Sequence, residues 1–161
     1  MPHYRVDVAD ARAHLFRVTL TLVRPAAAQR FSLPVWIPGS YLVRDFARHL
    51  SGLEASQRGA PVALEQLDKT TWVVHCTGRA TLTLRYRVYA FDPSVRGAFV
   101  GAERGFFNAS SLFLRAEGRE AEPHQVLIGR LPSGWEVVSA MTPGAGRRSF
   151  AAADYDVLID H

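Results

Sequence analysis

Strict alternation of apolar and polar residues along two segments constrains the fold more than any other feature of the sequence. In residues 14–23 every second side chain is apolar, as in Phe16, Val18, Leu20 and Leu22. Residues 80–90 repeat the pattern with Leu82, Leu84, Tyr86 and Val88. A period of two is typical of a β-strand that buries one face. The sequence therefore predicts two long, half-buried strands.

Shorter segments with strand-like composition fill most of the remaining chain. They are residues 4–8, 30–36, 50–56, 61–66, 71–75, 111–116, 125–128, 136–140 and 149–152. Turn-forming pairs such as Arg58-Gly59 and Pro143-Gly144 separate them. Many short strands with regular turns predict an all-β protein, either a β-sandwich or saddle-shaped antiparallel sheets. At most short helical segments are expected, near residues 41–49 and 154–160.

Three stretches interrupt the alternation. Residues 40–50 carry apolar side chains at helical spacing behind Ser40, which is predicted to cap a short helix, although an extended 41–43 competes. Residues 92–107 are rich in glycine and are predicted to form a long loop, a feature that is often functional. Asp154 is expected to cap a final helix. We therefore expect a β-rich domain over residues 1–153 and the start of a linker over 154–161.

Composition bounds the function. With 161 residues, of which 48% are hydrophobic, the chain has the size and balance of one globular domain. The formal charge of +4 comes from arginines spread along the chain, and the absence of a basic patch argues against nucleic-acid binding. No apolar run is long enough to cross a membrane. The start lacks a signal sequence and Cys76 is the single cysteine, which favours a cytoplasmic protein.

The residues do not assemble a complete active site or a metal site. The six histidines are scattered, and none belongs to a His-Glu-x-x-His motif, which places two zinc ligands on one helix face. Asp45 and His49 have i,i+4 spacing, but two ligands cannot hold zinc, so a hydrogen-bonded pair is favoured. Ser40 lacks the second glycine of a hydrolase elbow. His75 and Cys76 are strand neighbours that point to opposite faces.

Three segments resemble a known family. They are Leu-Pro-Val-Trp-Ile-Pro-Gly-Ser-Tyr-Leu-Val-Arg-Asp-Phe-Ala-Arg-His at 33–49, Tyr-Arg-Val-Tyr-Ala-Phe-Asp-Pro-Ser-Val-Arg at 86–96, and Arg-Gly-Phe-Phe-Asn-Ala-Ser-Ser-Leu-Phe at 104–113. Together they resemble the N-terminal domain of the bacterial glycyl aminopeptidase family, zinc metallopeptidases that also carry a PDZ domain. The likeness runs over essentially the whole chain. In that family a β-rich domain precedes a thermolysin-like catalytic domain bearing His-Glu-x-x-His.

The resemblance implies a non-catalytic domain that docks on a catalytic domain outside this chain and shapes the cleft for peptides with a free N-terminus. Zinc is expected in that catalytic domain and no cofactor in this segment. By analogy with aminopeptidase N, the loop around Phe106 is expected to line the cleft, and the substrate-binding candidates are Phe107, Asn108, Ser110 and Tyr41. Asn108 could offer its carbonyl to an ammonium group; its alternative is a positive-φ turn.

Other interpretations stay open for two of these positions and for the whole chain. Arg44 is a weaker candidate, and for Tyr41 and Arg44 the alternatives are packing and a structural ion pair. The rival function is a free-standing β-sandwich module that binds a peptide or a glycan. Exposure of Trp36, Trp72 or Trp135 as a flat platform would support that rival, and burial of all three would weaken it. An accessory domain should instead show a bare apolar docking patch.

Overall fold

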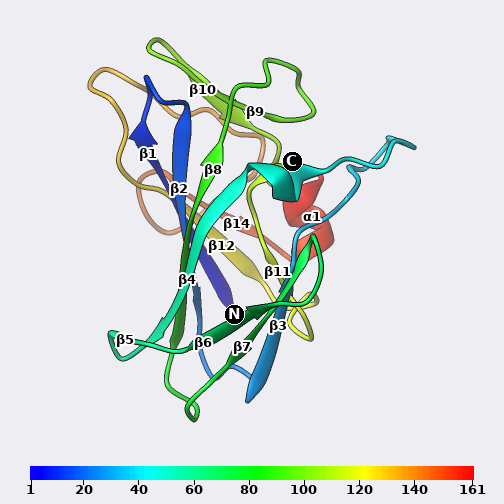
Figure 1. Ribbon diagram of the computed structural model, residues 1–161. Helices are drawn as coiled ribbons and strands as arrows, with labels where there is room; N and C mark the ends of the chain where they lie inside the picture. The colour runs from blue at the N-terminus through cyan, green and yellow to red at the C-terminus, as the bar shows by residue number, and fades with distance from the viewer.

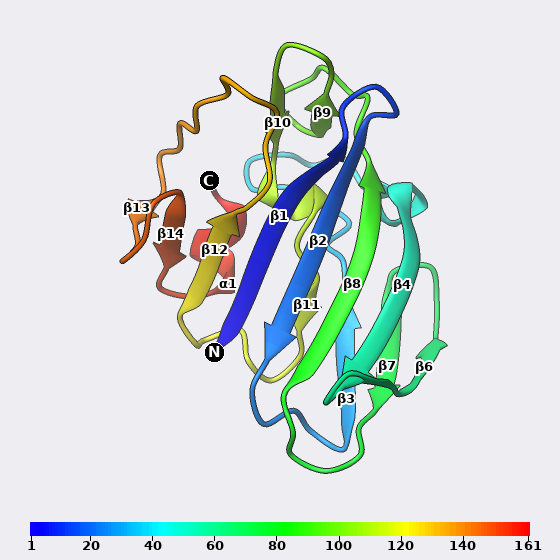
Figure 2. The same ribbon diagram turned by 90° about the vertical axis from the view of Figure 1, so that its left-hand side faces the viewer.

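The computed structural model describes residues 1–161 and is built from two stacked β-sheets (Figure 1, Figure 2). The larger sheet has eight strands in the order β13 (Thr142–Pro143), β14 (Ser149–Ala152), β12 (His124–Ile128), β1 (Pro2–Asp10), β2 (Leu15–Leu22), β8 (Leu82–Tyr89), β4 (Leu50–Gln57) and β5 (Ala60–Pro61). The smaller sheet has four strands in the order β11 (Arg115–Ala116), β3 (Ala28–Ser32), β7 (Thr71–His75) and β6 (Ala63–Gln66). The predicted all-β, sandwich-like fold is confirmed.

The remaining elements are short. A hairpin of β9 (Ala98–Val100) and β10 (Gly105–Phe107) extends one end of the sandwich, at the top of Figure 1. Two 3₁₀ turns, η1 (Phe46–His49) and η2 (Ala109–Ser111), and one helix, α1 (Tyr155–Ile159), complete the chain. None of these helical segments is long and apolar enough to span a membrane.

The alternation predicted for the two long strands sets the register of the larger sheet. Val18 of β2 lies between Val6 of β1 and Tyr86 of β8, and all three side chains are buried. Arg17 and Arg87, one residue away on adjacent strands, point outward and are exposed. The inner faces of both sheets and α1 share a core of 33 buried residues. The pairing of β1 with β12 is parallel, which the expectation of antiparallel sheets did not include.

The buried segment 112–114 lies between the sheets and outside both of them. Each of its carbonyl oxygens accepts a hydrogen bond from a buried tyrosine hydroxyl: Leu112 from Tyr86 at 2.7 Å, Phe113 from Tyr155 at 2.7 Å, and Leu114 from Tyr4 at 2.8 Å. A buried carbonyl without a partner is costly. The tyrosines therefore replace a strand ladder here. The strand predicted at 111–116 is wrong except for its last two residues, which form β11.

Other strand predictions differ from the structure at irregular segments. The predicted strand 30–36 ends at Ser32, two residues before Pro34, which has no N–H to donate to a neighbouring strand. Residues 136–140 form no strand. The segment 92–107, predicted as a loop, contains β9 and β10, in which Phe106 lies opposite Phe99. Gly97 and Gly101 flank β9 and Gly105 begins β10, so each strand has only three residues, too few for a periodic signal.

The two helix caps predicted from sequence have different outcomes. Ser40 does not cap a helix: its hydroxyl accepts a long hydrogen bond of 3.4 Å from the N–H of Leu42, and the 3₁₀ turn begins at Phe46. Asp154 is confirmed as a cap, because its carboxylate accepts a hydrogen bond of 2.8 Å from the N–H of Val157. Leu158 and Ile159, which needed an apolar surface, are buried in the core.

Replacing Asp154 by Ala is expected to lower the free energy of unfolding by about 1 kcal/mol. The N–H of Val157 loses its hydrogen-bond acceptor, while α1 stays packed against the core. Urea unfolding followed by fluorescence measures the difference. Asp160→Ala is the matched control, since its side chain is exposed and makes no hydrogen bond at the other end of α1. An equal loss in both variants would contradict a capping role.

Candidate functional site

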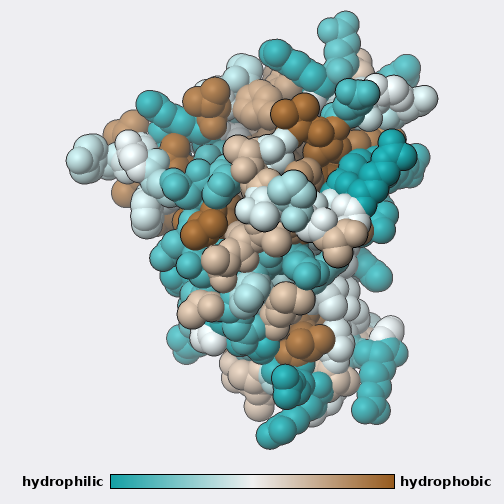
Figure 3. Space-filling view, turned by 180° about the vertical axis from the view of Figure 1, so that it is seen from behind, coloured by the Kyte–Doolittle hydropathy of each residue, from teal (hydrophilic) through white to brown (hydrophobic).

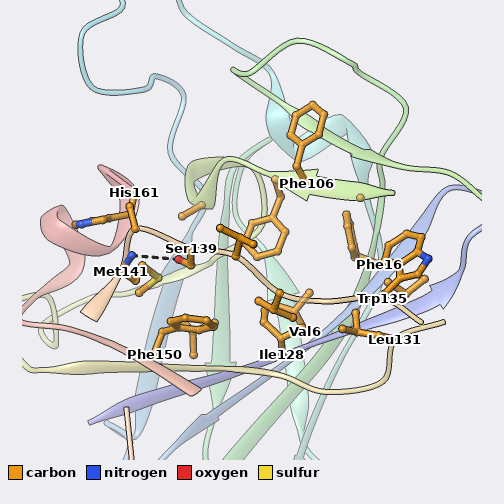
Figure 4. A pocket seen from close by; sticks show the side chains of 18 of the residues that line it. Val6, Phe16, Phe106, Ile128, Leu131, Trp135, Ser139, Met141, Phe150 and His161 are labelled. Atoms are coloured by element: carbon orange, nitrogen blue, oxygen red, sulfur yellow. Dashed lines mark hydrogen bonds between the residues drawn. The ribbon is translucent and has the colours of Figure 1, made fainter. Parts of the chain in front are cut away.

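Hydrophobic atoms gather at one end of the molecule. In Figure 3 they are most frequent in the upper half, the end that carries the β9–β10 hairpin in Figure 1. Two hollows lie in this part of the structure, one apolar and one polar. The apolar hollow has a volume of about 280 Å³, and 16 of its 20 lining residues are hydrophobic. Its walls are β1, β12, β10 and the irregular chain 131–141 (Figure 4).

The predicted cleft-lining residues Phe106 and Phe107 both border the apolar hollow. Phe107 packs edge-on against Phe16 and Phe113, with ring centroids 5.6 Å apart in each case. Phe106 instead stacks on Phe99 at 6.1 Å. Phe107 is thus held by the core, whereas Phe106 belongs to the hairpin that overhangs the hollow.

Asn108 and Ser110 are turned toward their own backbone. The side-chain oxygen of Asn108 accepts a hydrogen bond of 3.0 Å from the N–H of Ser110 and caps η2. Asn108 has φ −81° and ψ 132°, so the alternative of a positive-φ turn is wrong. Ser110 is fully buried, and its hydroxyl has no hydrogen-bond partner. In this conformation Ser110 is enclosed, and the Asn108 oxygen already serves one donor.

Tyr41 and Arg44 lie on the irregular chain that precedes η1. Tyr41 is completely exposed and packs against nothing. The backbone N–H of Arg44 bonds to the carbonyl of Val35, but no carboxylate lies within 4.0 Å of its guanidinium. The alternatives of packing for Tyr41 and an ion pair for Arg44 are therefore wrong. The Arg44 Nε is shielded from water and has no partner.

Arg44 lines the second, polar hollow, of about 430 Å³, between residues 43–49 and the loop 88–98. Arg48, His49 and Asp92 also line it. The predicted pairing of His49 with Asp45 is wrong, because His49 Nε2 accepts a hydrogen bond of 3.1 Å from Arg48 Nε instead. Burial, followed by the charge of Arg48, lowers the pKa of His49.

Sequence reasoning did not assign Arg48 and Asp92 to a site. The signal was indirect: they lie in the first two of the three segments that resemble the aminopeptidases. Chain folding places those segments on the two sides of one hollow.

Comparison with known proteins settles the family. Residues 3–161 match the family described as peptidase M61 N-terminal domain. The chain belongs to this family. Among solved structures, this M61 N-terminal domain superposes with a TM-score of 0.95 and 37% sequence identity on an aminopeptidase N family protein from Idiomarina loihiensis. The match covers 99% of this chain and 28% of that one, so the domain spans little more than a quarter of its relative.

Two more distant structures resemble the domain too weakly to support an argument about its function. The M1 zinc metallopeptidase of Deinococcus radiodurans, in unbound form, matches 95% of this chain and 38% of its own at 13% identity and a TM-score of 0.47. Its E323A mutant bound to a Tyr-Ser-Ala substrate gives the same TM-score at 14% identity, over 93% and 37% of the two chains. Curated protein sequences contain no match to the chain.

The M61 N-terminal domain does not offer a set of zinc ligands. No three histidine, cysteine, aspartate or glutamate side chains come together anywhere in the structure. A catalytic zinc site needs three protein ligands around the ion. The residues of this chain therefore do not fit a catalytic zinc.

The tryptophans do not form the platform that a free-standing binding module would need. Trp72 is buried in the core, 5% exposed. Trp135 is partly buried and contacts Gly105 in the wall of the apolar hollow (Figure 4). Trp36 is half-exposed on the chain that leads to Tyr41. A ligand can therefore reach Trp36 on the surface and Trp135 through the hollow that it lines, but not Trp72.

Proposed function

We propose that this M61 N-terminal domain is the non-catalytic front module of a zinc-dependent aminopeptidase. It docks on the catalytic domain and narrows the cleft for peptides with a free N-terminus. The observation that carries the proposal is the close match of the whole domain to 28% of an aminopeptidase N family protein. The finer assignment, a glycyl aminopeptidase with a PDZ domain, rests on the three sequence segments at 33–49, 86–96 and 104–113.

The four predicted substrate-binding residues differ in how far their side chains are accessible to a peptide. Phe107 lines the apolar hollow and, with Phe106, supplies a surface for a small peptide side chain. Tyr41 is free of contacts. For Asn108 to receive an ammonium group, its side-chain oxygen would accept a second hydrogen bond beside that from Ser110. Ser110 is enclosed and supports the loop from behind.

The test begins with the reading frame beyond the codon for His161. We expect it to encode His-Glu-x-x-His and a further glutamate about one helix later. The longer protein should then release N-terminal glycine or alanine from short peptides. Removal of zinc by a chelator should abolish this activity, and added zinc should restore it. A frame without the motif, or a longer protein inactive with zinc bound, would refute the proposal.

A variant of the longer protein tests the cleft-lining role. Phe106→Ala should raise KM for peptides several-fold and change kcat less, because the hairpin side chain contributes binding rather than chemistry. Leu67→Ala is the matched control, since this exposed apolar side chain does not line the hollow. Equal KM values for both variants and the unmodified protein would remove Phe106 from the cleft.

A further inference from the structure

Exposed apolar side chains are concentrated on two loops at one end of the domain. Residues 34–45 and 89–96, together called the docking face below, carry Trp36, Tyr41, Leu42, Val43, Phe91 and Val95. Tyr41, Val43 and Val95 are each more than 80% exposed. Val35 and Tyr89, at lower exposure, belong to the same two loops, and the exposed large apolar residues elsewhere are scattered singly, as is normal for a monomer. Val43 and Phe91 border the same hollow, and a gathering of exposed apolar side chains of this kind marks an interaction site.

A cation without a partner lies between the two loops. Arg44 lines the polar hollow, its Nε is inaccessible to water, and no hydrogen-bond acceptor in the chain reaches that nitrogen. Asp45 and Asp92 border the same hollow but lie more than 4.0 Å from that group. Removing an arginine nitrogen from water without an acceptor is unfavourable. The arrangement is complementary to a carboxylate that comes from outside the chain.

The docking face also lies beside the end of the described chain. The turn η1 contacts η2, and η2 contacts α1, so the docking face and the last helix lie at neighbouring positions. Figure 1 shows the C-terminus at the base of the projecting loop 34–45. The family description makes this an N-terminal domain, and the solved relative has most of its length outside the matched region. A domain that follows α1 would therefore start next to this surface.

We infer that the docking face is the surface on which the rest of the same polypeptide packs, and that a carboxylate of that partner pairs with Arg44. The inference rests on the proposed function in taking the partner from the same chain, and it adds the surface and the recognition chemistry. Apolar side chains of the partner cover Tyr41 and Val43, and an aspartate or glutamate enters the polar hollow. A guanidinium–carboxylate pair in such a site is charge-assisted and directional.

Oxidative footprinting of tyrosine tests the surface. Tyr41 should be modified at least tenfold faster by hydroxyl radicals in the 161-residue protein than in the longer protein encoded by the full reading frame. Tyr89, which is about half-exposed at the edge of the same face, should be protected less. Equal rates for Tyr41 in the two proteins would overturn the inference.

Replacement of Arg44 tests the carboxylate by a change of sign. In the 161-residue protein Arg44→Met should leave the unfolding temperature unchanged or raise it, because an unpaired cation is removed. In the longer protein the same change should lower it by about 3 °C or more, because a partner carboxylate then loses its cation. Arg79→Met, at an exposed turn at the other end of the domain, is the control and should change neither.

The outcomes separate the two proposals. A longer protein without peptidase activity in which Tyr41 is protected refutes the proposed function alone. An active peptidase in which Tyr41 reacts as fast as in the 161-residue protein overturns this inference alone. A loss of stability on Arg44→Met in the 161-residue protein also overturns it, since Arg44 would then serve the isolated fold. A reading frame that ends at His161 removes both.

Discussion

Replacing Tyr86 by Phe is expected to lower the free energy of unfolding by about 2–6 kcal/mol. The Tyr86 hydroxyl donates a hydrogen bond of 2.7 Å to the carbonyl of Leu112 and accepts one of 3.3 Å from the N–H of Leu114. Burial raises the pKa of Tyr86, so the hydroxyl remains a donor over the accessible pH range. Phe keeps the ring volume but leaves two buried backbone groups unpaired, each of which costs about 1–3 kcal/mol.

Urea unfolding with linear extrapolation measures this loss, and Tyr41→Phe is its matched control. Tyr41 makes no contact in the domain, so that variant should stay within about 0.5 kcal/mol of the unmodified protein. Tyr155→Phe should have an intermediate effect, because its hydroxyl serves one carbonyl only. If Tyr86→Phe were as stable as the control, the tyrosine support of residues 112–114 would not contribute to stability.

A second large effect is expected on lowering the pH. His124 is 1% exposed, its ring stacks on Tyr4 and lies tilted against Tyr155, and its Nδ1 bonds to the carbonyl of Glu122 at 2.7 Å. Burial lowers its pKa from 6.5, against smaller opposing contributions from that hydrogen bond and from Asp154. Below pH 6.5 the unfolded chain therefore binds a proton that the folded chain does not. Stability should fall by up to about 1.4 kcal/mol per pH unit in this range.

Measuring the free energy of unfolding between pH 7.5 and pH 5, at intervals of about half a pH unit, tests this expectation. His124→Gln should reduce the slope to the part that comes from His49, whose pKa is also lowered, because glutamine can donate to the Glu122 carbonyl but does not titrate. The exposed His75 provides the control, and His75→Gln should leave the slope as it is. An unchanged slope in His124→Gln would show that His124 does not cause the dependence.

Carboxylates change the stability of the domain in a separate, more acidic pH range. Hydrogen bonding from Arg119, outweighing partial burial, lowers the pKa of Glu122 from 4.5 to about 2. A lowered carboxyl pKa contributes stability that is present above 4.5 and is lost as the pH falls toward the folded value. The two contributions therefore do not overlap in the range where His124 is tested.

The sequence was informative where a local rule decides the outcome. Alternation alone placed the strands around Val18 and Tyr86 and assigned their buried and exposed faces, because successive strand residues always point to opposite sides. Asp154 was recognised as a cap because its hydrogen bond to Val157 spans three residues. The three segments at 33–49, 86–96 and 104–113 indicated a peptidase-related domain, and the match over residues 3–161 establishes the M61 family.

The tertiary structure alone decided the features that join distant residues. Nothing in the local pattern at 112–114 indicates that tyrosines from positions 4, 86 and 155 would replace its strand partners. The isolation of Arg44 depends likewise on where two loops from different parts of the chain come to rest. Periodicity and capping report interactions within a few residues, whereas the pairing of a buried polar group depends on every segment that surrounds it.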